Sequence, residues 1–299
     1  MTSGRPPRAT AEAGPFSARM HWLDWMTDLV GLLLWLSWRG FGSLPVSPRP
    51  ALTLLSNLRP ANRTTRRSPL FLPALVVLLV ARALLQHTFS SQFAEAVPWS
   101  IGAVTVMFRS DLWSRILAHS FLSWTHFVLQ AYLCLALLAT LHRSDADPDS
   151  ITRSVRAELG MVARWPWGLA LIPFLGAMAL LWLAVSPALV SAGLTPARIP
   201  GFHSAQQALV VALGGLTALK WPLVGLCLLR FLLDHVYLGS MPFWDYAHGT
   251  GRRLSAWLGW LPLKWSRVDF TPLAAAGVYW SLGYFLQGGV PRLFLRLPL

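Results

Sequence analysis

Apolar residues in this chain come in six long blocks, separated by polar or basic segments, and not in amphipathic stripes. The blocks fall at 22–38, 70–86, 116–141, 167–190, 205–238 and 270–287. A helix needs about 20 residues to cross the hydrocarbon core of a membrane, and flanking Trp and Arg residues can complete the shorter blocks. We therefore expect an all-α fold, a polytopic transmembrane helix bundle with about six spans.

Two segments depart from this regular pattern. Residues 205–238 are too long for one straight span, and they contain Lys220-Trp221-Pro222. A proline inside a helix costs about 3 kcal/mol or kinks the helix. We therefore expect a break there, with 205–219 tilted or re-entrant and 222–238 crossing the membrane. Residues 96–108 are apolar but too short to cross, so we expect them to lie in the membrane interface or to re-enter.

The composition agrees with a membrane protein. Of the 299 residues, 55% are hydrophobic and only 12% are charged, and the mean hydropathy is +0.50. A soluble domain carries about 25% charged residues. Basic residues outnumber acidic ones by 25 to 12, but they cluster between the apolar blocks. This placement favours anionic lipid over nucleic acid as the partner, because a basic residue near an anionic membrane surface contributes roughly 1 kcal/mol.

The basic loops predict the orientation of the chain in the membrane. Loops 39–69, 142–164 and 239–268 together hold 14 Lys and Arg residues, whereas the segments on the opposite side hold 8. We therefore expect these three loops in the cytoplasm and both termini outside, in a multi-pass protein of the cell inner membrane. Residues 1–21 contain no apolar stretch, so we expect a disordered tail and no cleavable signal peptide.

Three ionisable residues are expected at the outer end of the first two spans. Asp24 and Asp28 lie four residues apart, and Arg82 reaches a similar depth on the second span. A charge inside a bilayer costs about 2.5–3.5 kcal/mol, so it needs a partner or a purpose. We predict a contact between Asp28 and Arg82 with Asp24 nearby, which is either a structural link between helices or a cation or proton site.

A second charged group is expected near the inner side. Arg230 and Asp234 form an i,i+4 pair, and Asp269 opens the last span at the same depth, which predicts an ion pair that fixes the basic loop. Lys220 lies deeper and has no obvious partner. Together with Pro222 it is a candidate for a functional break in the helix, and a packing kink is the alternative.

The third block carries a polar stripe. Its members recur on one helical face and are His119, Ser123, His126, Gln130 and Cys134. In lipid such a stripe must face protein or water, so this helix is predicted to be central in the bundle. The two histidines could ligate haem or metal if other helices supplied partners, but hydrogen-bonded core histidines are the commoner case.

Motifs of known enzymes are missing from the sequence. The histidine-bearing helix superficially resembles that of rhomboid proteases, but those need a Gly-x-Ser nucleophile turn, and no Gly-x-Ser occurs in the chain. The sequence also has no P-loop, no Gly-x-Gly-x-x-Gly and no His-Glu-x-x-His. We therefore expect no catalytic activity and no cofactor.

Residues 239–287 combine a Trp- and Arg-rich linker with an apolar block that starts at Val268-Asp269-Phe270-Thr271-Pro272. Thr or Asp would cap the helix and Pro would lie in its first turn. This stretch resembles the second half of the YggT/YlmG family of bacterial and plastid membrane proteins. The loop would lie on the membrane, with Trp rings embedded and basic groups facing phosphate. These residues are Trp244, Arg252, Arg253, Trp257, Trp260, Lys264, Trp265 and Arg267.

The resemblance also implies a degenerate internal repeat. Residues 22–86 and 222–299 would be two helix–loop–helix copies, and 87–221 an insertion with two further spans. Leu29-Val30-Gly31 echoes Leu223-Val224-Gly225, although the first copy lacks the Asp-Phe step. Functions implied by the family are envelope organisation, cell division or osmotic adaptation. We expect a non-enzymatic scaffold or assembly factor that binds anionic lipid and other membrane proteins. A small ion or solute transporter that uses the buried Asp, Lys and His groups is the alternative.

Overall fold

A computed structural model of the chain describes residues 15–40, 70–93, 97–108, 112–145, 149–195, 202–237, 239, 241–265 and 268–296. Most of them are helical, as expected. The long helices are α1 (Pro15–Arg39), α2 (Phe71–Phe93), α3 (Trp113–Leu141), α5 (Trp167–Ser191), α6 (Phe202–Gly214), α7 (Lys220–His235) and α9 (Thr271–Arg296). The shorter elements are α4 (Ser150–Leu159), α8 (Pro242–Ser255), the 3-10 turns η2 (Gly160–Arg164), η3 (Gly215–Leu219) and η4 (Ala256–Leu258), and strands β1 (Val97–Ile101), β2 (Val104–Phe108), β3 (Lys264–Trp265) and β4 (Val268–Asp269).

Among the described residues, four helical stretches are long and apolar enough to cross a membrane, which indicates a membrane protein. They are Phe71–Phe89, Trp113–Leu141, Trp167–Ser191 and His203–His235. Helices α1 and α9 form where the first and last apolar blocks predict them, but they are not among these four. Asp24 and Asp28 make α1 more polar, and α9 is rich in small and aromatic residues. The full set of six spans stays a prediction.

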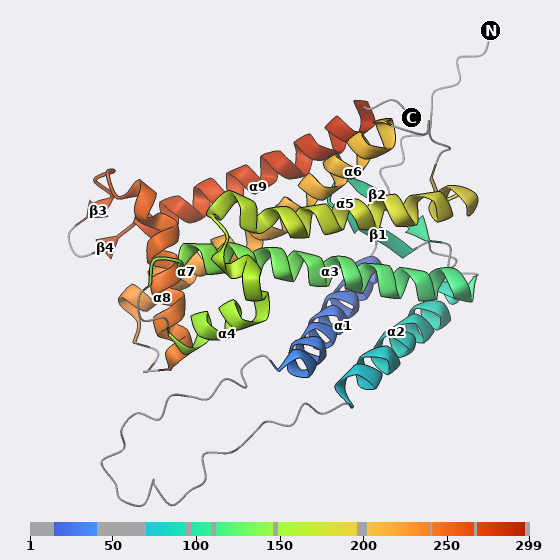
Figure 1. Cartoon of the computed structure of the whole chain (residues 1–299), viewed down its shortest axis with the longest axis horizontal. Coiled ribbons are helices and arrows are strands. Elements are labelled where there is room, and N and C mark those ends of the chain that lie inside the picture. The colour runs from blue at the N-terminus through green and yellow to red at the C-terminus, as the bar shows by residue number, and fades with distance from the viewer. Residues whose placement is uncertain are drawn as a thin grey trace, which may run out of the picture.

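Helix α3 runs through the middle of the molecule, with α5 and α9 on one side and α1 and α2 on the other (Figure 1). It packs against α1, α2, α4, α5 and α8 and against both strands of the first hairpin. His119 and His126, from its polar stripe, are buried in these contacts. The predicted central position of this helix is therefore confirmed.

Residues 97–108 form an antiparallel β-hairpin, in place of the interfacial or re-entrant apolar segment that we expected. Its buried side chains include Trp99, Ile101 and Val106, and they pack on α5, α6 and α9. Pairing between the strands satisfies backbone groups that lipid could not. A period of two is present in the sequence, because buried Val97, Trp99 and Ile101 alternate with exposed positions, but the high apolar content of the segment hides it.

The long fifth block departs from α-helical geometry earlier than its proline predicts. The 3-10 turn η3 joins α6 to α7, and Pro222 is the third residue of α7. The missing N–H of a proline removes no helix hydrogen bond in the first turn. The turn lies close against α5, since a Cβ at Gly215 would lie 2.3 Å from the sulfur of Met178. The prediction of a break at Lys220-Trp221-Pro222 was therefore wrong by about one turn, and 205–219 continues directly into α7 without turning back.

The basic-aromatic loop is more structured than the membrane-lying hairpin that we expected. Residues 242–255 form the amphipathic helix α8, which packs on α7 and buries Tyr246, Ala247 and Leu254. Two short strands, β3 and β4, then lead to α9. Arg267 and residues 1–14 of the predicted tail lie outside the described residues. Residues 15–21 of that tail belong to helix α1, so for them the prediction of disorder was wrong.

The two proposed repeat units are represented by two packed helix pairs. Helix α1 packs against α2, and α7 packs against α9. Residues 41–69, which connect the first pair, lie outside the described residues. The repeat itself stays a prediction.

Candidate functional site

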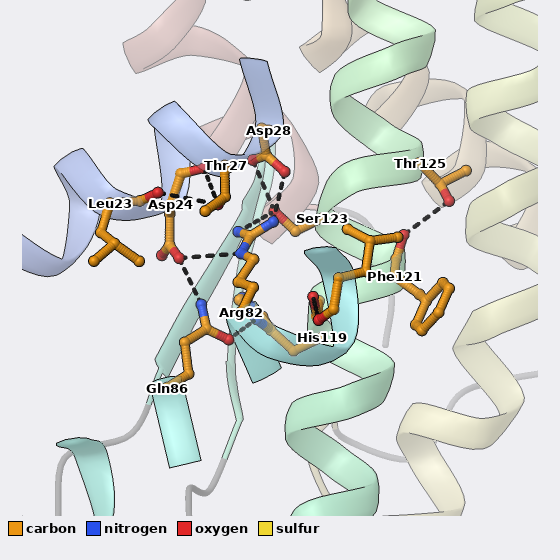
Figure 2. Close-up of polar contacts among 12 residues, drawn as sticks. Leu23, Asp24, Thr27, Asp28, Arg82, Gln86, His119, Phe121, Ser123 and Thr125 are labelled. Carbon is orange, nitrogen blue, oxygen red and sulfur yellow. Dashed lines mark hydrogen bonds and ion pairs between the residues drawn. The ribbon is translucent and has the colours of Figure 1, made fainter. Parts of the chain in front are cut away.

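The first polar cluster lies between α1, α2 and α3 and is centred on Arg82 (Figure 2). The guanidinium donates to Asp28 Oδ1 at 2.5 Å, to Asp24 Oδ1 at 3.2 Å and to Ser123 Oγ at 3.2 Å. The Arg82 side chain is 1% exposed. The predicted contact between Asp28 and Arg82 is confirmed, and Asp24 shares it.

Gln86 and His119 extend this cluster. The Gln86 amide donates to Asp24 Oδ1 at 2.5 Å, and its oxygen lies 3.3 Å from His119 Nδ1. An amide oxygen only accepts, so His119 is the donor. Sequence reasoning missed Gln86, although it follows Arg82 by one helical turn. The result is a chain of bonded polar groups across three helices, which stabilises their packing.

The inner part of the α3 stripe also has partners. Gln130 Nε2 lies 3.4 Å from His126 Nε2, and Trp99 of the β-hairpin packs edge-on against the His126 ring. Among the described residues, no group of three or more His, Cys, Asp or Glu side chains is placed to hold a metal ion. His119 and His126 are thus arranged as hydrogen-bonded core residues.

Lys220 has partners on α9, contrary to our expectation. Its Nζ lies 3.3 Å from Gln287 Oε1 and 3.9 Å from the centroid of the Trp280 ring. A cation over an exposed aromatic face gains about 0.5–1 kcal/mol, and the Trp280 ring is 44% exposed. Gly283 leaves room for the lysine stem, since a Cβ there would lie 2.5 Å from Lys220 Cδ. Gln287 and Trp280 are uncharged, so a search of the sequence for residues of opposite charge does not find them as partners of Lys220.

Arg230 links α7 to the start of α9, as predicted. It lies 3.6 Å from Asp234 and 3.4 Å from Asp269, and it also contacts the Ser255 hydroxyl. The other oxygen of Asp269 accepts from the Thr271 backbone N–H at 3.0 Å. Asp269 therefore caps α9 while it pairs with Arg230, which explains the Asp-Phe-Thr-Pro step.

The second polar cluster ties together α4, α8 and the turn His142–Asp145, which we call the α4–α8 cap. It lies at the end of the bundle where α3 finishes (Figure 1). His142 contacts Asp145 at 2.9 Å and Thr250 at 2.8 Å, and its ring stacks on Tyr246 with centroids 5.0 Å apart.

Two arginines complete the cap. Arg253 donates to the Leu141 carbonyl at 2.6 Å and to the Asp145 carboxylate. Arg156 donates to the His142 carbonyl at 2.5 Å. Both therefore bind carbonyls that the end of α3 leaves without helical partners. The prediction that Arg253 faces lipid phosphate was wrong, because its guanidinium holds α8 against α3.

The exposed residues of α8, η4 and the turn that follows η4 retain the expected aromatic and basic character. Arg252 is exposed, Trp260 is 77% exposed and Trp257 is 48% exposed. Trp244 is half-buried, and Trp257 also donates to the Tyr279 hydroxyl at 3.2 Å. We call Arg252, Trp257 and Trp260 the exposed cap face. Sequence composition located this face, but it could not tell which arginine points inward.

Comparison with protein-family models, with curated proteins and with solved structures finds no match to this chain. The resemblance to the YggT/YlmG family therefore rests on the residues quoted for it. The choice between functions rests on the contacts of the two polar clusters and on the exposed cap face.

We expect the cap to make the stability of the protein sensitive to acid. Partial burial raises the pKa of Asp145, but hydrogen bonds and charge from Arg253 and His142 outweigh it, so the pKa lies below its ordinary value of 3.8. A carboxylate with a lowered folded-state pKa stabilises the fold above its ordinary pKa, and that contribution is lost as the pH falls through the lowered value. We expect Asp145→Asn to reduce the melting temperature at pH 7, and the difference from the wild type to shrink as the pH falls below about 4.

Thermal unfolding of both proteins in detergent, measured from pH 7 to pH 3, checks this expectation. A difference that stays constant over the whole range would show that the charge of Asp145 does not stabilise the cap.

Proposed function

We propose that the protein is a non-enzymatic membrane scaffold or assembly factor of the YggT/YlmG type, which works through the exposed cap face. The observation that carries the proposal is the contrast between the basic residues inside the bundle, which have partners, and the exposed cap face. Arg82, Lys220 and Arg230 are all bonded to neighbours inside the bundle. Arg252 remains exposed on α8, which is itself bonded to α3, and Trp257 and Trp260 remain exposed just after it, in η4 and the following turn.

Attachment of α8 supports a docking role for this surface. The Arg253 bonds to α3 and the His142 bond to Thr250 hold α8 in place before any partner arrives. A pre-organised surface loses less conformational entropy on binding than a loop does. Trp and Arg are also the residue types that contribute most to protein interfaces. The partners that fit are anionic lipid and other membrane proteins on the side of the basic loops, which we place in the cytoplasm.

The resemblance at Asp269-Phe270-Thr271-Pro272 gives the proposal its biological context. It connects the chain to envelope organisation, cell division or osmotic adaptation, in the cell inner membrane. The cap of α9 by Asp269 and its pairing with Arg230 give that step a structural reason.

Transport is the second candidate, and the β-hairpin favours it. Non-helical backbone within a membrane bundle is tolerated only where it is buried in protein or lines a water-filled cavity. The hairpin lies beside the first polar cluster, where Phe108 packs edge-on against His119. A pathway would use Asp28, Lys220 or His126, and each is bonded or packed in the observed structure. These bonds favour the scaffold.

Rescue of a deletion strain tests the proposal. We expect Arg252→Gln/Trp260→Ala to lose rescue, because it removes a charge and a ring from the exposed cap face. Both side chains are exposed, so the variant should accumulate in the membrane to the wild-type level. The purified variant should keep the melting temperature of the wild type. Replacing all the basic residues of loop 239–268 together would not test the surface, because Arg253 is bonded to α3 and its loss would disturb the fold.

The matched control is Trp22→Ala/Arg292→Gln, which removes the same two groups from exposed positions on α1 and α9 and should rescue fully. Full rescue by the Arg252→Gln/Trp260→Ala variant would remove the cap face as the working surface. Altered ion or solute flux in liposomes for Asp28→Asn, Lys220→Met or His126→Ala would instead support transport.

A further inference from the structure

A cavity of about 690 Å³ opens where the end of α3, helix α4 and the turn η2 meet. Arg143, Arg156 and Arg164 line it together with small or flexible residues, among them Gly160 and Met161. None of the described residues that line it is acidic. Three guanidinium groups around an open cavity create a strongly positive local potential.

Nearby carboxylates have other partners. Asp145 is bound by Arg253 and His142. Glu158 is bound by Arg39 at 3.0 Å and by the Tyr132 hydroxyl. Asp149 accepts from the Thr152 backbone N–H at 2.7 Å and caps α4. Within the described part of the chain, these carboxylates therefore do not pair with the three cavity arginines, which can bind an external anion.

One of these arginines is held in place by the fold. Arg156 donates to the His142 carbonyl at 2.5 Å, so its guanidinium is positioned against the end of α3 before a ligand binds. Arg143 and Arg164 are exposed at the cavity wall. An arginine offers planar paired donors that match the oxygens of a phosphate group.

The cavity lies next to the start of a membrane span. Arg164 precedes α5 by two residues, Trp165 and Pro166, and α5 begins at Trp167. Trp165 is 42% exposed and Trp167 is 65% exposed. Exposed tryptophans at the end of a span mark the headgroup layer of the membrane. Met161, which is 78% exposed, adds an apolar group at the rim.

We propose that this cavity is a binding site for a phosphate group, supplied by the headgroup of an anionic phospholipid. The arginines bind the phosphate, the exposed Met161 and Trp167 contact the glycerol and upper acyl region, and the acyl chains run along α5. Basic pockets beside spans on the cytoplasmic side are a known means of headgroup recognition. The site is separate from the exposed cap face, and its test does not depend on a scaffold function.

The test is lipid binding by the delipidated, purified full chain in neutral detergent, measured by native mass spectrometry with phosphatidylglycerol and, separately, phosphatidylcholine. We expect phosphatidylglycerol to bind and phosphatidylcholine to bind far more weakly. Arg143→Gln/Arg164→Gln should weaken phosphatidylglycerol binding about 30-fold, as expected for the loss of two basic contacts near a headgroup. Arg156 is left in place, because its bond to α3 makes it structural.

The matched control is Arg153→Gln/Arg292→Gln, which removes the same net charge from exposed positions that do not line the cavity, and it should bind like the wild type. An equal loss of binding in both double variants would overturn the site, because net charge alone would explain it. Unchanged binding by the Arg143→Gln/Arg164→Gln variant would overturn it as well. Displacement of the lipid by inorganic phosphate at millimolar concentration would overturn the lipid as the source of the phosphate.

Discussion

Replacing Arg82 by Met is expected to lower the free energy of unfolding by about 3–5 kcal/mol, because it leaves the buried Asp28 carboxylate and the partly buried Asp24 carboxylate without their cation. Arg82 is 1% exposed and bonds to both Asp24 and Asp28. Methionine keeps most of the side-chain volume, so the loss reports the charge and not a cavity. Equilibrium unfolding in mixed detergent and SDS micelles measures the change.

The control removes the whole charged group. Arg82→Met combined with Asp24→Asn and Asp28→Asn leaves no unpaired charge, and a buried ion group can often be replaced by neutral residues at little cost. We expect this triple variant to recover at least half of the loss. A single Arg82→Met variant within about 1 kcal/mol of the wild type would show that the carboxylates reach water without Arg82.

Gly102→Ala is expected to cost about 2–5 kcal/mol and to release the β-hairpin from the bundle. Gly102 lies at the tip of the hairpin with φ +57, and a Cβ there would lie 2.4 Å from the carbonyl oxygen of Gly214. Backbone meets backbone at this point, so neither side can move aside at low cost. The same unfolding measurement, together with hydrogen exchange of residues 97–108, reports the loss of docking.

Gly193→Ala separates the two contributions to that cost. Gly193 also has a positive φ, of 70°, but a Cβ there meets nothing within 4 Å. It should therefore cost only the backbone strain, about 1–2 kcal/mol. Equal losses for Gly102→Ala and Gly193→Ala would mean that the hairpin tip does not dock against Gly214.

Helices could be predicted from the sequence because lipid leaves the backbone few other ways to satisfy its hydrogen bonds. The position of each charged residue along its apolar block gives its expected depth in the membrane. Matching these depths was enough to pair Asp28 with Arg82 and to place Arg230 beside Asp269. Charges restrict the possible partners strongly, since an unpaired charge in the bilayer is costly. The α3 stripe likewise indicated a central helix, and the structure confirms it.

Contacts that depend on the rotation of one helix against another could not be predicted. Gln86 and Gln287 are uncharged, so nothing in the sequence identifies them as partners of Asp24 and Lys220. Arg253 and Arg252 are neighbours with opposite roles, and only the packing of α8 on α3 separates them. The β-hairpin was missed because the apolar content of 96–108 suggested contact with lipid, whereas its alternation indicated strands.

Recovery of a partner from native membranes tests the scaffold function most directly. Tagged wild type, Arg252→Gln/Trp260→Ala and Trp22→Ala/Arg292→Gln would be solubilised in mild detergent, and the co-purifying proteins quantified by mass spectrometry. A scaffold that works through the exposed cap face predicts a near-stoichiometric partner with the wild type and with the Trp22→Ala/Arg292→Gln control, and a loss of about 10-fold or more with the cap-face variant. A preparation without a partner, or one whose partner is retained equally by all three proteins, would contradict the account.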